Sequence, residues 1–135
     1  MTVPLCMLSR RMRGSKPSVL LVEDDHSIAQ LYSIKLRMDG YRVDIANDAA
    51  TAAIAFDRAR PDVVCVDSRL PDGSGRDVMG AMVGSGATVM LLTNDQEAYD
   101  RPPAGVAGAL LKWRTTPAAL SDAIAGLIRV KQASK

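Results

Sequence analysis

The sequence has little of what secreted and membrane proteins rely on. Among its 135 residues there are only two cysteines, Cys6 and Cys65, and Cys65 lies within an apolar run typical of a buried strand. A structural disulfide between them is therefore not expected, and a reducing cytoplasm fits this cysteine content. No apolar run approaches the roughly 20 residues that a membrane-spanning helix requires. We therefore expect a cytoplasmic protein that has no membrane partner.

The sequence also has only one histidine and no glycine-rich phosphate-binding loop. The one histidine, His26, has no neighbours at metal-ligand spacing, so we expect it to be exposed at the start of a helix. The stretch Gly73-Ser74-Gly75 lacks the further glycine of a phosphate-binding loop. We interpret it as a turn that leads into a helix.

Positive charge is concentrated at the start of the chain. The net charge is +2, but residues 1–16 hold four basic residues and no acidic one, which leaves 13 basic and 15 acidic groups in the remainder. Nucleic-acid binding by the whole chain is thus not indicated, and basic residues that follow the apolar ones do not make a secretory signal. We expect a flexible extension at 1–16, one domain at 17–131 and a tail at 132–135. A later start at Met7 or Met12, or a basic arm for an acidic partner, are the alternatives for the extension.

Polar side chains follow four short apolar runs, at the point where each run ends. Such runs, separated by helical patterns, indicate parallel strands covered on both faces. Parallel strands end at one edge of a sheet, where ligands of open α/β proteins bind, so these side chains should converge. The runs are 19–22 followed by Glu23 and Asp24, 63–66 followed by Asp67, 89–92 followed by Thr93, and 109–111 followed by Lys112.

The segments between these runs are mostly helical in pattern. We expect Ile54 and Phe56 to help pack the buried side of the second helix. The alternation of five strands with helices predicts a doubly wound α/β sandwich. The remaining predicted elements are a helix at 25–38 capped by Asp25 or Ser27, a strand at 41–46, a helix capped by Asn47 or Asp48 that ends before Pro61, a helix at 76–83, and a last helix capped by Thr116 that starts at Pro117.

Four segments together resemble the receiver domain of two-component response regulators. They are VLLVEDD, VVCVDSRLPDGSG, VMLLTN and GALLKW, and the resemblance covers residues 16–131. It implies a flavodoxin-like fold, in which a five-stranded parallel sheet of strand order 2-1-3-4-5 carries helices on both faces.

The resemblance also implies a chemistry for the edge of the sheet. Asp67 would be the phosphoacceptor, a carboxylate nucleophile that takes a phosphoryl group from a histidine kinase, a phosphotransfer protein or a small phosphodonor. Such a domain is not an enzyme, because it assists only its own phosphorylation and dephosphorylation, and it signals to a downstream protein without binding nucleic acid. The other implied roles are phosphoryl binding by Thr93 and Lys112, and Mg²⁺ binding by Glu23, Asp24, Asp67 and the main-chain carbonyl of Arg69.

Two departures from the family lie beside Lys112. Trp113 follows it where the family usually has a proline, often after a cis bond. A cis bond without proline costs about 3 kcal/mol, so we predict a trans bond here and a lysine that still reaches Asp67. Ala109 stands three positions before the lysine, where an aromatic switch residue is common.

The segment between Thr93 and Lys112 departs further. Asn94 occupies a position where the family usually has a small residue. Residues 95–100 suffice for one or two helical turns before Arg101-Pro102-Pro103 forces an extended backbone. We therefore predict a shortened or displaced fourth helix. We also predict that phosphorylation perturbs mainly the loops around Arg69, Asn94 and Trp113, and leaves the last helix nearly unchanged.

These departures keep a second hypothesis open. A phosphorylation-independent pseudo-receiver would use the same fold as an interaction scaffold. An aspartate-nucleophile phosphohydrolase fits less well, because such enzymes generally need a second acid two residues after the nucleophile and Arg69 occupies that place.

Overall fold

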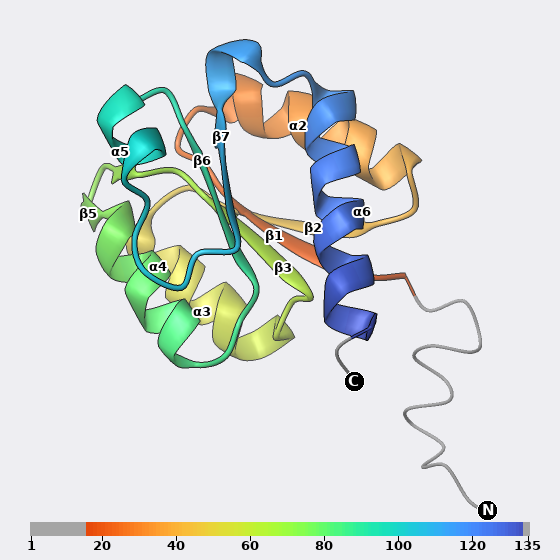
Figure 1. Ribbon diagram of the computed structural model, residues 1–135, viewed down its shortest axis with the longest axis horizontal. Coiled ribbons are helices and arrows are strands. Elements are labelled where there is room, and N and C mark those ends of the chain that lie inside the picture. Colours follow the sequence, from red (N-terminus) through yellow and green to blue (C-terminus); the bar gives the residue numbers. More distant parts are fainter. Residues whose placement is uncertain (1–15, 134–135) are drawn as a thin grey trace, which may run out of the picture.

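Five parallel strands form one sheet in the order β2-β1-β3-β6-β7 (Figure 1). The computed structural model describes residues 16–133, so the extension expected at 1–16 lies, except for Lys16, outside the described residues. The order confirms the predicted fold, because β6 and β7 are the fourth and fifth strands of the sheet. The strands are β1 Ser18–Val22, β2 Arg42–Ala46, β3 Val63–Val66, β6 Val89–Thr93 and β7 Gly108–Leu111.

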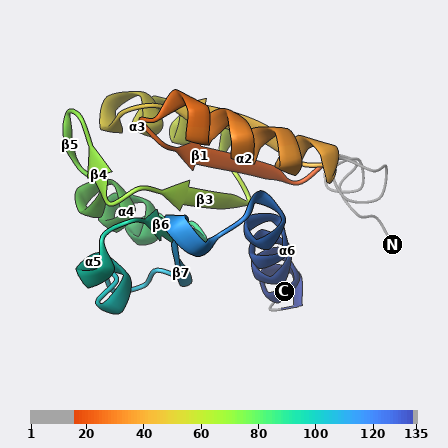
Figure 2. The same ribbon diagram turned by 90° about the horizontal axis from the view of Figure 1, so that it is seen from above.

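Helices cover both faces of the sheet. Figure 1 shows α2 and α6 on one face and α3, α4 and α5 on the other, and Figure 2 shows β1, β3, β6 and β7 following one another across the middle layer. A two-stranded antiparallel hairpin, β4 paired with β5, and a 3₁₀ turn, η1, complete the fold. The bounds are α2 His26–Met38, α3 Ala49–Ala59, β4 Arg69–Leu70, β5 Gly73–Ser74, α4 Gly75–Gly84, α5 Gln96–Asp100, η1 Lys112–Arg114 and α6 Pro117–Ala133.

The apolar strands supply the core on both sides at once. In β1, Val19 and Leu21 pack with α2 and α6, whereas Leu20 and Val22 pack with the helices of the opposite face. Side chains alternate between the two faces of a strand, so a strand covered on both sides has no position that suits a polar residue. This explains why the runs are continuous and why the first polar groups come where the strands end.

Helix caps follow the sequence prediction. Asp25 accepts a hydrogen bond from the Ile28 N–H at 3.0 Å and starts α2. Asp48, rather than Asn47, accepts one from the Thr51 N–H at 2.7 Å and starts α3. These carboxylates satisfy amides that have no partner inside the helix. The predicted cap of α6 is also confirmed, because Thr116 accepts a hydrogen bond from the Ala119 N–H at 3.0 Å.

The predicted inward side of α3 is partly wrong. Phe56 is buried, but Ile54 is 59% exposed. Two residues apart on a helix, at about 100° per residue, side chains point in nearly opposite directions, so both cannot face the sheet. The inward positions of α3 belong to Ala52 and Phe56.

No helix within residues 16–133 has the length and apolar character that a bilayer crossing demands.

Burial predicts an inert thiol at Cys65. Its side chain is fully buried in β3, and burial raises the pKa of the thiol to about 12. Because the thiolate is the reactive form, a Cys6→Ser variant should resist iodoacetamide at pH 8 when native and react fully in urea. Intact mass spectrometry measures both. Rapid alkylation of the native variant would show that the strand opens far more readily than this packing allows.

Candidate functional site

The four strand-end groups meet at one edge of the sheet. Glu23 follows β1, Asp67 follows β3, Thr93 ends β6 and Lys112 follows β7, all four strands being parallel. Asp67, Thr93 and Lys112 border a pocket of about 480 Å³, and Glu23 is buried beside Lys112. The structure thus brings together the residues that the sequence singled out. The pocket is lined by Asp24, Asp67, Arg69, Thr93, Asn94, Asp95, Gln96 and Lys112.

Lys112 links two buried carboxylates. Its ammonium nitrogen lies 2.5 Å from Glu23 Oε1 and 2.7 Å from Asp67 Oδ2, and Glu23 is only 1% exposed. There is no cis peptide bond in the described part of the chain, and Lys112 opens the turn η1. Both predictions for this loop are therefore confirmed: the bond to Trp113 is trans, and the lysine reaches Asp67.

The protonation of this cluster is set by burial and pairing together. Burial acts to lower the pKa of Lys112, but its hydrogen bonds to Asp67 and Glu23 outweigh burial and hold the pKa above its usual value. Burial raises the pKa of Glu23, while Lys112 acts in the opposite direction. The ammonium is the main reason that two carboxylates can lie together in this poorly solvated place.

Thr93 is held by two groups that the sequence analysis did not identify. Its hydroxyl oxygen lies 2.6 Å from the Ser68 hydroxyl and accepts a hydrogen bond from the Asp95 N–H at 2.9 Å. Threonine hydroxyls commonly accept from the amide two residues on, so the second contact could have been found from spacing. The first depends on how β3 and β6 pair, for which the sequence holds no local signal.

Three carboxylates at the rim have the spacing of a metal site. One oxygen from each of Glu23, Asp24 and Asp67 lies within 4.8 Å of the others. Hard carboxylate oxygens suit Mg²⁺, and Asp67 keeps acceptor capacity although Oδ1 receives the Arg69 N–H at 3.2 Å. Asp25 caps α2, as expected, and is not part of this set.

The loop after Asp67 is fixed at both ends. Asp72 accepts hydrogen bonds from the amides of Ala49, at 2.7 Å, and Ala50, at 3.1 Å, and these bonds hold its pKa below the usual value. At the other end Gly75 packs on the backbone of the loop: a Cβ there would lie 1.9 Å from the main-chain oxygen of Asp67. Position 75 therefore requires glycine, because the Asp67 backbone lies too close for a Cβ. The interpretation of Gly73-Ser74-Gly75 as a turn did not include this role.

Comparison with known proteins decides the family. The model of the response regulator receiver domain matches residues 19–124. The chain belongs to the response regulator receiver domain family. It is 39% identical over 94 residues to "Probable transcriptional regulatory protein TcrX" of Mycobacterium tuberculosis, an alignment that covers 68% of this chain and 40% of the relative. The chain spans less than half the length of the curated relatives named TcrX and TrcR.

Solved receiver structures share the fold. A receiver domain from Methanospirillum hungatei superposes with a TM-score of 0.82 at 21% identity, covering 90% of this chain and all of that one (100%). The response regulator TrrA of Thermotoga maritima, solved in complex with Mg²⁺ and BeF, gives 0.75 at 24% identity, covering 82% and 98%. At these identities the likeness establishes the receiver fold alone.

Two glycines of α4 make a matched test of the packing around Asp67. Gly75→Ala forces a Cβ into the Asp67 backbone and should destabilise the domain by about 2 kcal/mol. Gly80→Ala meets nothing within 4 Å and should stabilise the helix by about 1 kcal/mol. Urea unfolding of both variants measures the difference. Equal stability of the two would mean that the loop is not packed against Gly75 in solution.

Proposed function

We propose that this receiver domain is a phosphoacceptor that takes a phosphoryl group on Asp67. The observation that supports this most is the Lys112 ammonium, 2.7 Å from Asp67 and paired also with Glu23, at the same pocket as Thr93. Phosphoryl transfer depends on positioning and on neutralising charge, and these groups are arranged for both.

Each residue has one part in the proposed reaction. An oxygen of Asp67 attacks phosphorus, while the P–N bond of a phosphohistidine, or the P–O bond of acetyl phosphate, breaks and its electron pair leaves with the donor. Lys112 balances charge on the transferred oxygens, and the Thr93 hydroxyl donates a hydrogen bond to one of them. Because Asp67 is itself modified, the domain acts as a stoichiometric acceptor and not as an enzyme with an external substrate.

The residues present fit a bound Mg²⁺. Glu23, Asp24 and Asp67 would hold it, with the main-chain carbonyl of Arg69 as the further predicted ligand. Three carboxylates and one ammonium leave a net charge of −2 at the rim, which a divalent cation balances. Bound there, Mg²⁺ would supply positive charge that offsets the charge of the carboxylates and of the phosphoryl oxygens. The related TrrA structure contains Mg²⁺, which supports the assignment by analogy.

The partners follow from the family. We propose a histidine kinase or phosphotransfer protein as donor and a downstream protein as target, both in the cytoplasm. The pseudo-receiver alternative keeps the fold and omits the chemistry, so the same phosphorylation assay separates the two. A mass gain at Asp67 supports the phosphoacceptor, and its absence with an intact fold supports the scaffold.

Acetyl phosphate with Mg²⁺ should modify the chain once. Intact mass spectrometry should show a gain of one phosphoryl group that disappears when EDTA removes the metal. Asp67→Asn keeps the shape of the side chain but removes the nucleophile, so it should gain nothing. The control is Asp77→Asn, which changes an exposed carboxylate on α4 and should be modified as the wild type is. Modification of Asp67→Asn at the wild-type rate would refute the acceptor assignment.

Mg²⁺ alone should stabilise the fold. Binding to the native state only raises the free energy of unfolding by about 2.7 kcal/mol when the ion is at 100 times its Kd, and we expect millimolar binding. Thermal unfolding with and without Mg²⁺ measures this.

Asp24 offers the cleanest variant for that measurement. It is exposed, so Asp24→Asn should weaken the Mg²⁺-induced rise in Tm without unpairing the buried Glu23 and Lys112. Asp44→Asn, an exposed carboxylate on β2, is the matched control and should leave the rise intact. If both variants respond to Mg²⁺ as the wild type does, the metal does not bind at this rim.

A further inference from the structure

The Ser68 hydroxyl forms a close pair with the hydroxyl of Thr93 beside the pocket. The two oxygens lie 2.6 Å apart, and the Thr93 side chain is buried. Ser68 comes directly after Asp67, whereas Thr93 ends β6, the strand that pairs with β3. The pair therefore joins the neighbour of the proposed acceptor to a residue that is proposed to bind the phosphoryl group.

The backbone around Ser68 is held on both sides. The Asp67 N–H donates a hydrogen bond to the Val22 carbonyl at 3.0 Å, and the Gly75 N–H donates one to the Ser68 carbonyl at 3.2 Å. The same Gly75 lies against the Asp67 backbone, so this segment has no free space on the side of α4. Ser68 is thus fixed by the fold itself, which is what a group needs if it acts by orienting another group.

The hydrogen-bonding capacity of Thr93 gives the pair a direction. A threonine hydroxyl has one proton and two lone pairs, and one lone pair of Thr93 accepts the Asp95 N–H at 2.9 Å. Between Thr93 and Ser68 either oxygen can be the donor. When Thr93 donates to an oxygen in the pocket, its proton is used, so the contact with Ser68 persists only if Ser68 donates. Both lone pairs of Thr93 then accept from the protein, and its proton is left for the pocket.

We propose that Ser68 is a positioning residue for phosphoryl transfer: its hydroxyl donates to Thr93 and so commits the Thr93 hydroxyl to donate to the transferred phosphoryl group. This rests on the proposed function. The hydrogen bonds run in one direction, from Ser68 to Thr93 to the phosphoryl oxygen, and each bond in such a chain polarises and strengthens the next. In this role Ser68 acts through Thr93 and needs no contact with the phosphoryl group.

The rate of mass gain with acetyl phosphate and Mg²⁺, measured in the full chain, tests this role. Ser68→Ala removes the hydroxyl without adding bulk and should slow phosphorylation about fivefold, the order of one hydrogen bond between neutral groups. Ser68→Thr keeps a hydroxyl at a half-buried position and should restore most of the rate. The Mg²⁺-induced rise in Tm should stay unchanged in both variants, because Ser68 is not one of the carboxylates of the metal site.

A double-mutant cycle with Thr93→Val separates this role from a structural one. Valine has nearly the shape of threonine but no hydroxyl, so Ser68 has nothing to orient in that background. Adding Ser68→Ala to Thr93→Val should therefore change the rate by less than about twofold, although Thr93→Val alone is slower than the wild type. A fivefold loss that persists in the Thr93→Val background would overturn the proposal.

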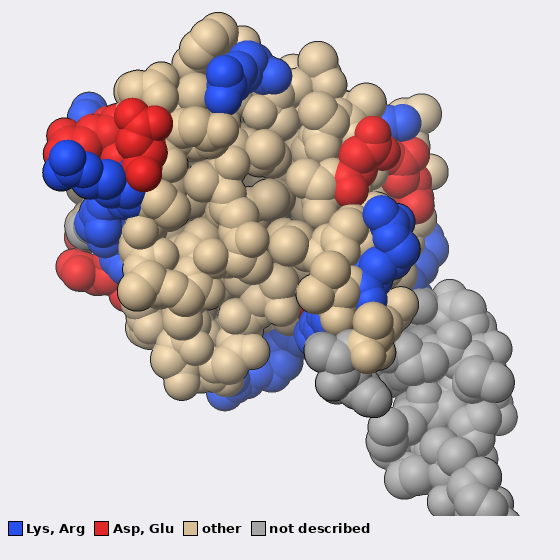
Figure 3. Space-filling view, viewed as in Figure 1, with Lys and Arg blue, Asp and Glu red and all other residues tan. Residues whose placement is uncertain are grey.

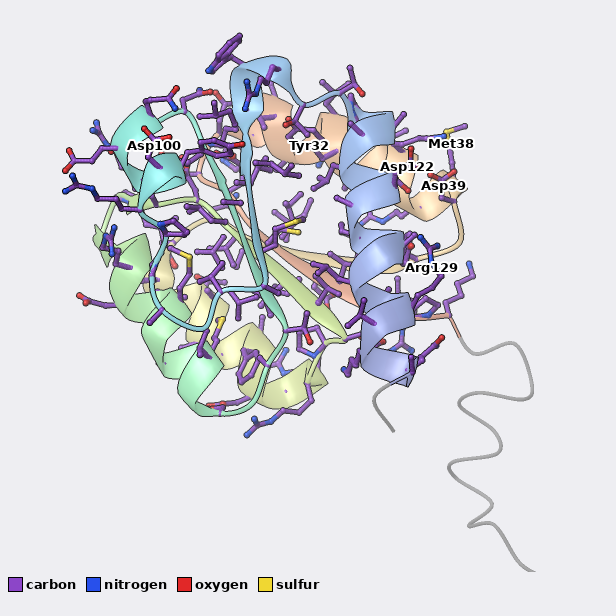
Figure 4. The ribbon with its side chains drawn as sticks, viewed as in Figure 1. Tyr32, Met38, Asp39, Asp100, Asp122 and Arg129 are labelled. Atoms are coloured by element: carbon purple, nitrogen blue, oxygen red, sulfur yellow. The ribbon has the colours of Figure 1, made fainter. Side chains whose placement is uncertain are left out.

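Ser121→Ala is the matched control. The Ser121 hydroxyl also makes a short side-chain hydrogen bond, to Asp39 at 2.5 Å, but this bond joins α6 to the end of α2. Figure 4 shows Asp39 on the opposite side of the molecule from Asp100 of α5, the helix whose first residue lines the pocket. Ser121→Ala should therefore lower the Tm and leave the rate of phosphorylation unchanged.

These variants all carry the same charges. Acidic and basic side chains crowd together over α5, next to the pocket (Figure 3), and such charges affect how strongly an anionic donor is attracted. A difference in rate among the variants thus does not arise from attraction of the donor. Equal rates for the wild type and Ser68→Ala, or no recovery in Ser68→Thr, would overturn the proposal while the phosphoacceptor assignment stands. Absence of any mass gain in the wild type would remove the proposed function, and this proposal with it.

Discussion

The Lys112 ammonium between Glu23 and Asp67 is the interaction on which the site depends. Two carboxylates at the end of a buried sheet would each lose hydration without a compensating partner, and the ammonium contacts both at 2.5 and 2.7 Å. Removing one partner from such a buried pair typically costs about 3–5 kcal/mol, because the charge left behind stays buried. The positive charge of the same ammonium reduces the electrostatic repulsion between the acidic rim and the oxygens of a phosphoryl donor. The stability of the site and its proposed reactivity thus depend on one side chain.

The fold brings Lys112 to the rim although Trp113 follows it in place of the proline that is usual in the family. Parallel pairing of β6 with β7 places Lys112 at the rim beside Thr93, and a trans bond into a 3₁₀ turn then leads the chain away. The turn puts Arg114 against Tyr99, and with Trp113 after it the Lys112 ammonium still contacts Asp67. A short α5 before Pro102 and Pro103 completes this arrangement.

The sequence predicts the parts that follow from periodicity and strand ends. Helix caps and the convergence of Glu23, Asp67, Thr93 and Lys112 depend on patterns within short segments or on the rule that parallel strands end at one edge. The strand order was expected from the resemblance to receiver domains and is confirmed. Ile54 was misplaced because an alanine-rich helix offers few apolar residues from which to choose its inward face. The contacts of Ser68 with Thr93 and of Gly75 with the Asp67 backbone could not be predicted, because they arise from close packing of segments whose separation is fixed only by the tertiary fold.

The central claim is that the Asp67 carboxylate itself carries the phosphoryl group. An acyl phosphate, unlike a phosphate ester, is reduced by borohydride, which converts the aspartyl side chain to the alcohol of homoserine. Peptide mass spectrometry after treatment with acetyl phosphate and then borohydride therefore reads the acceptor directly. The account predicts homoserine at position 67 and at no other aspartate. Homoserine elsewhere, or a phosphorylated chain that borohydride leaves unchanged, would contradict it.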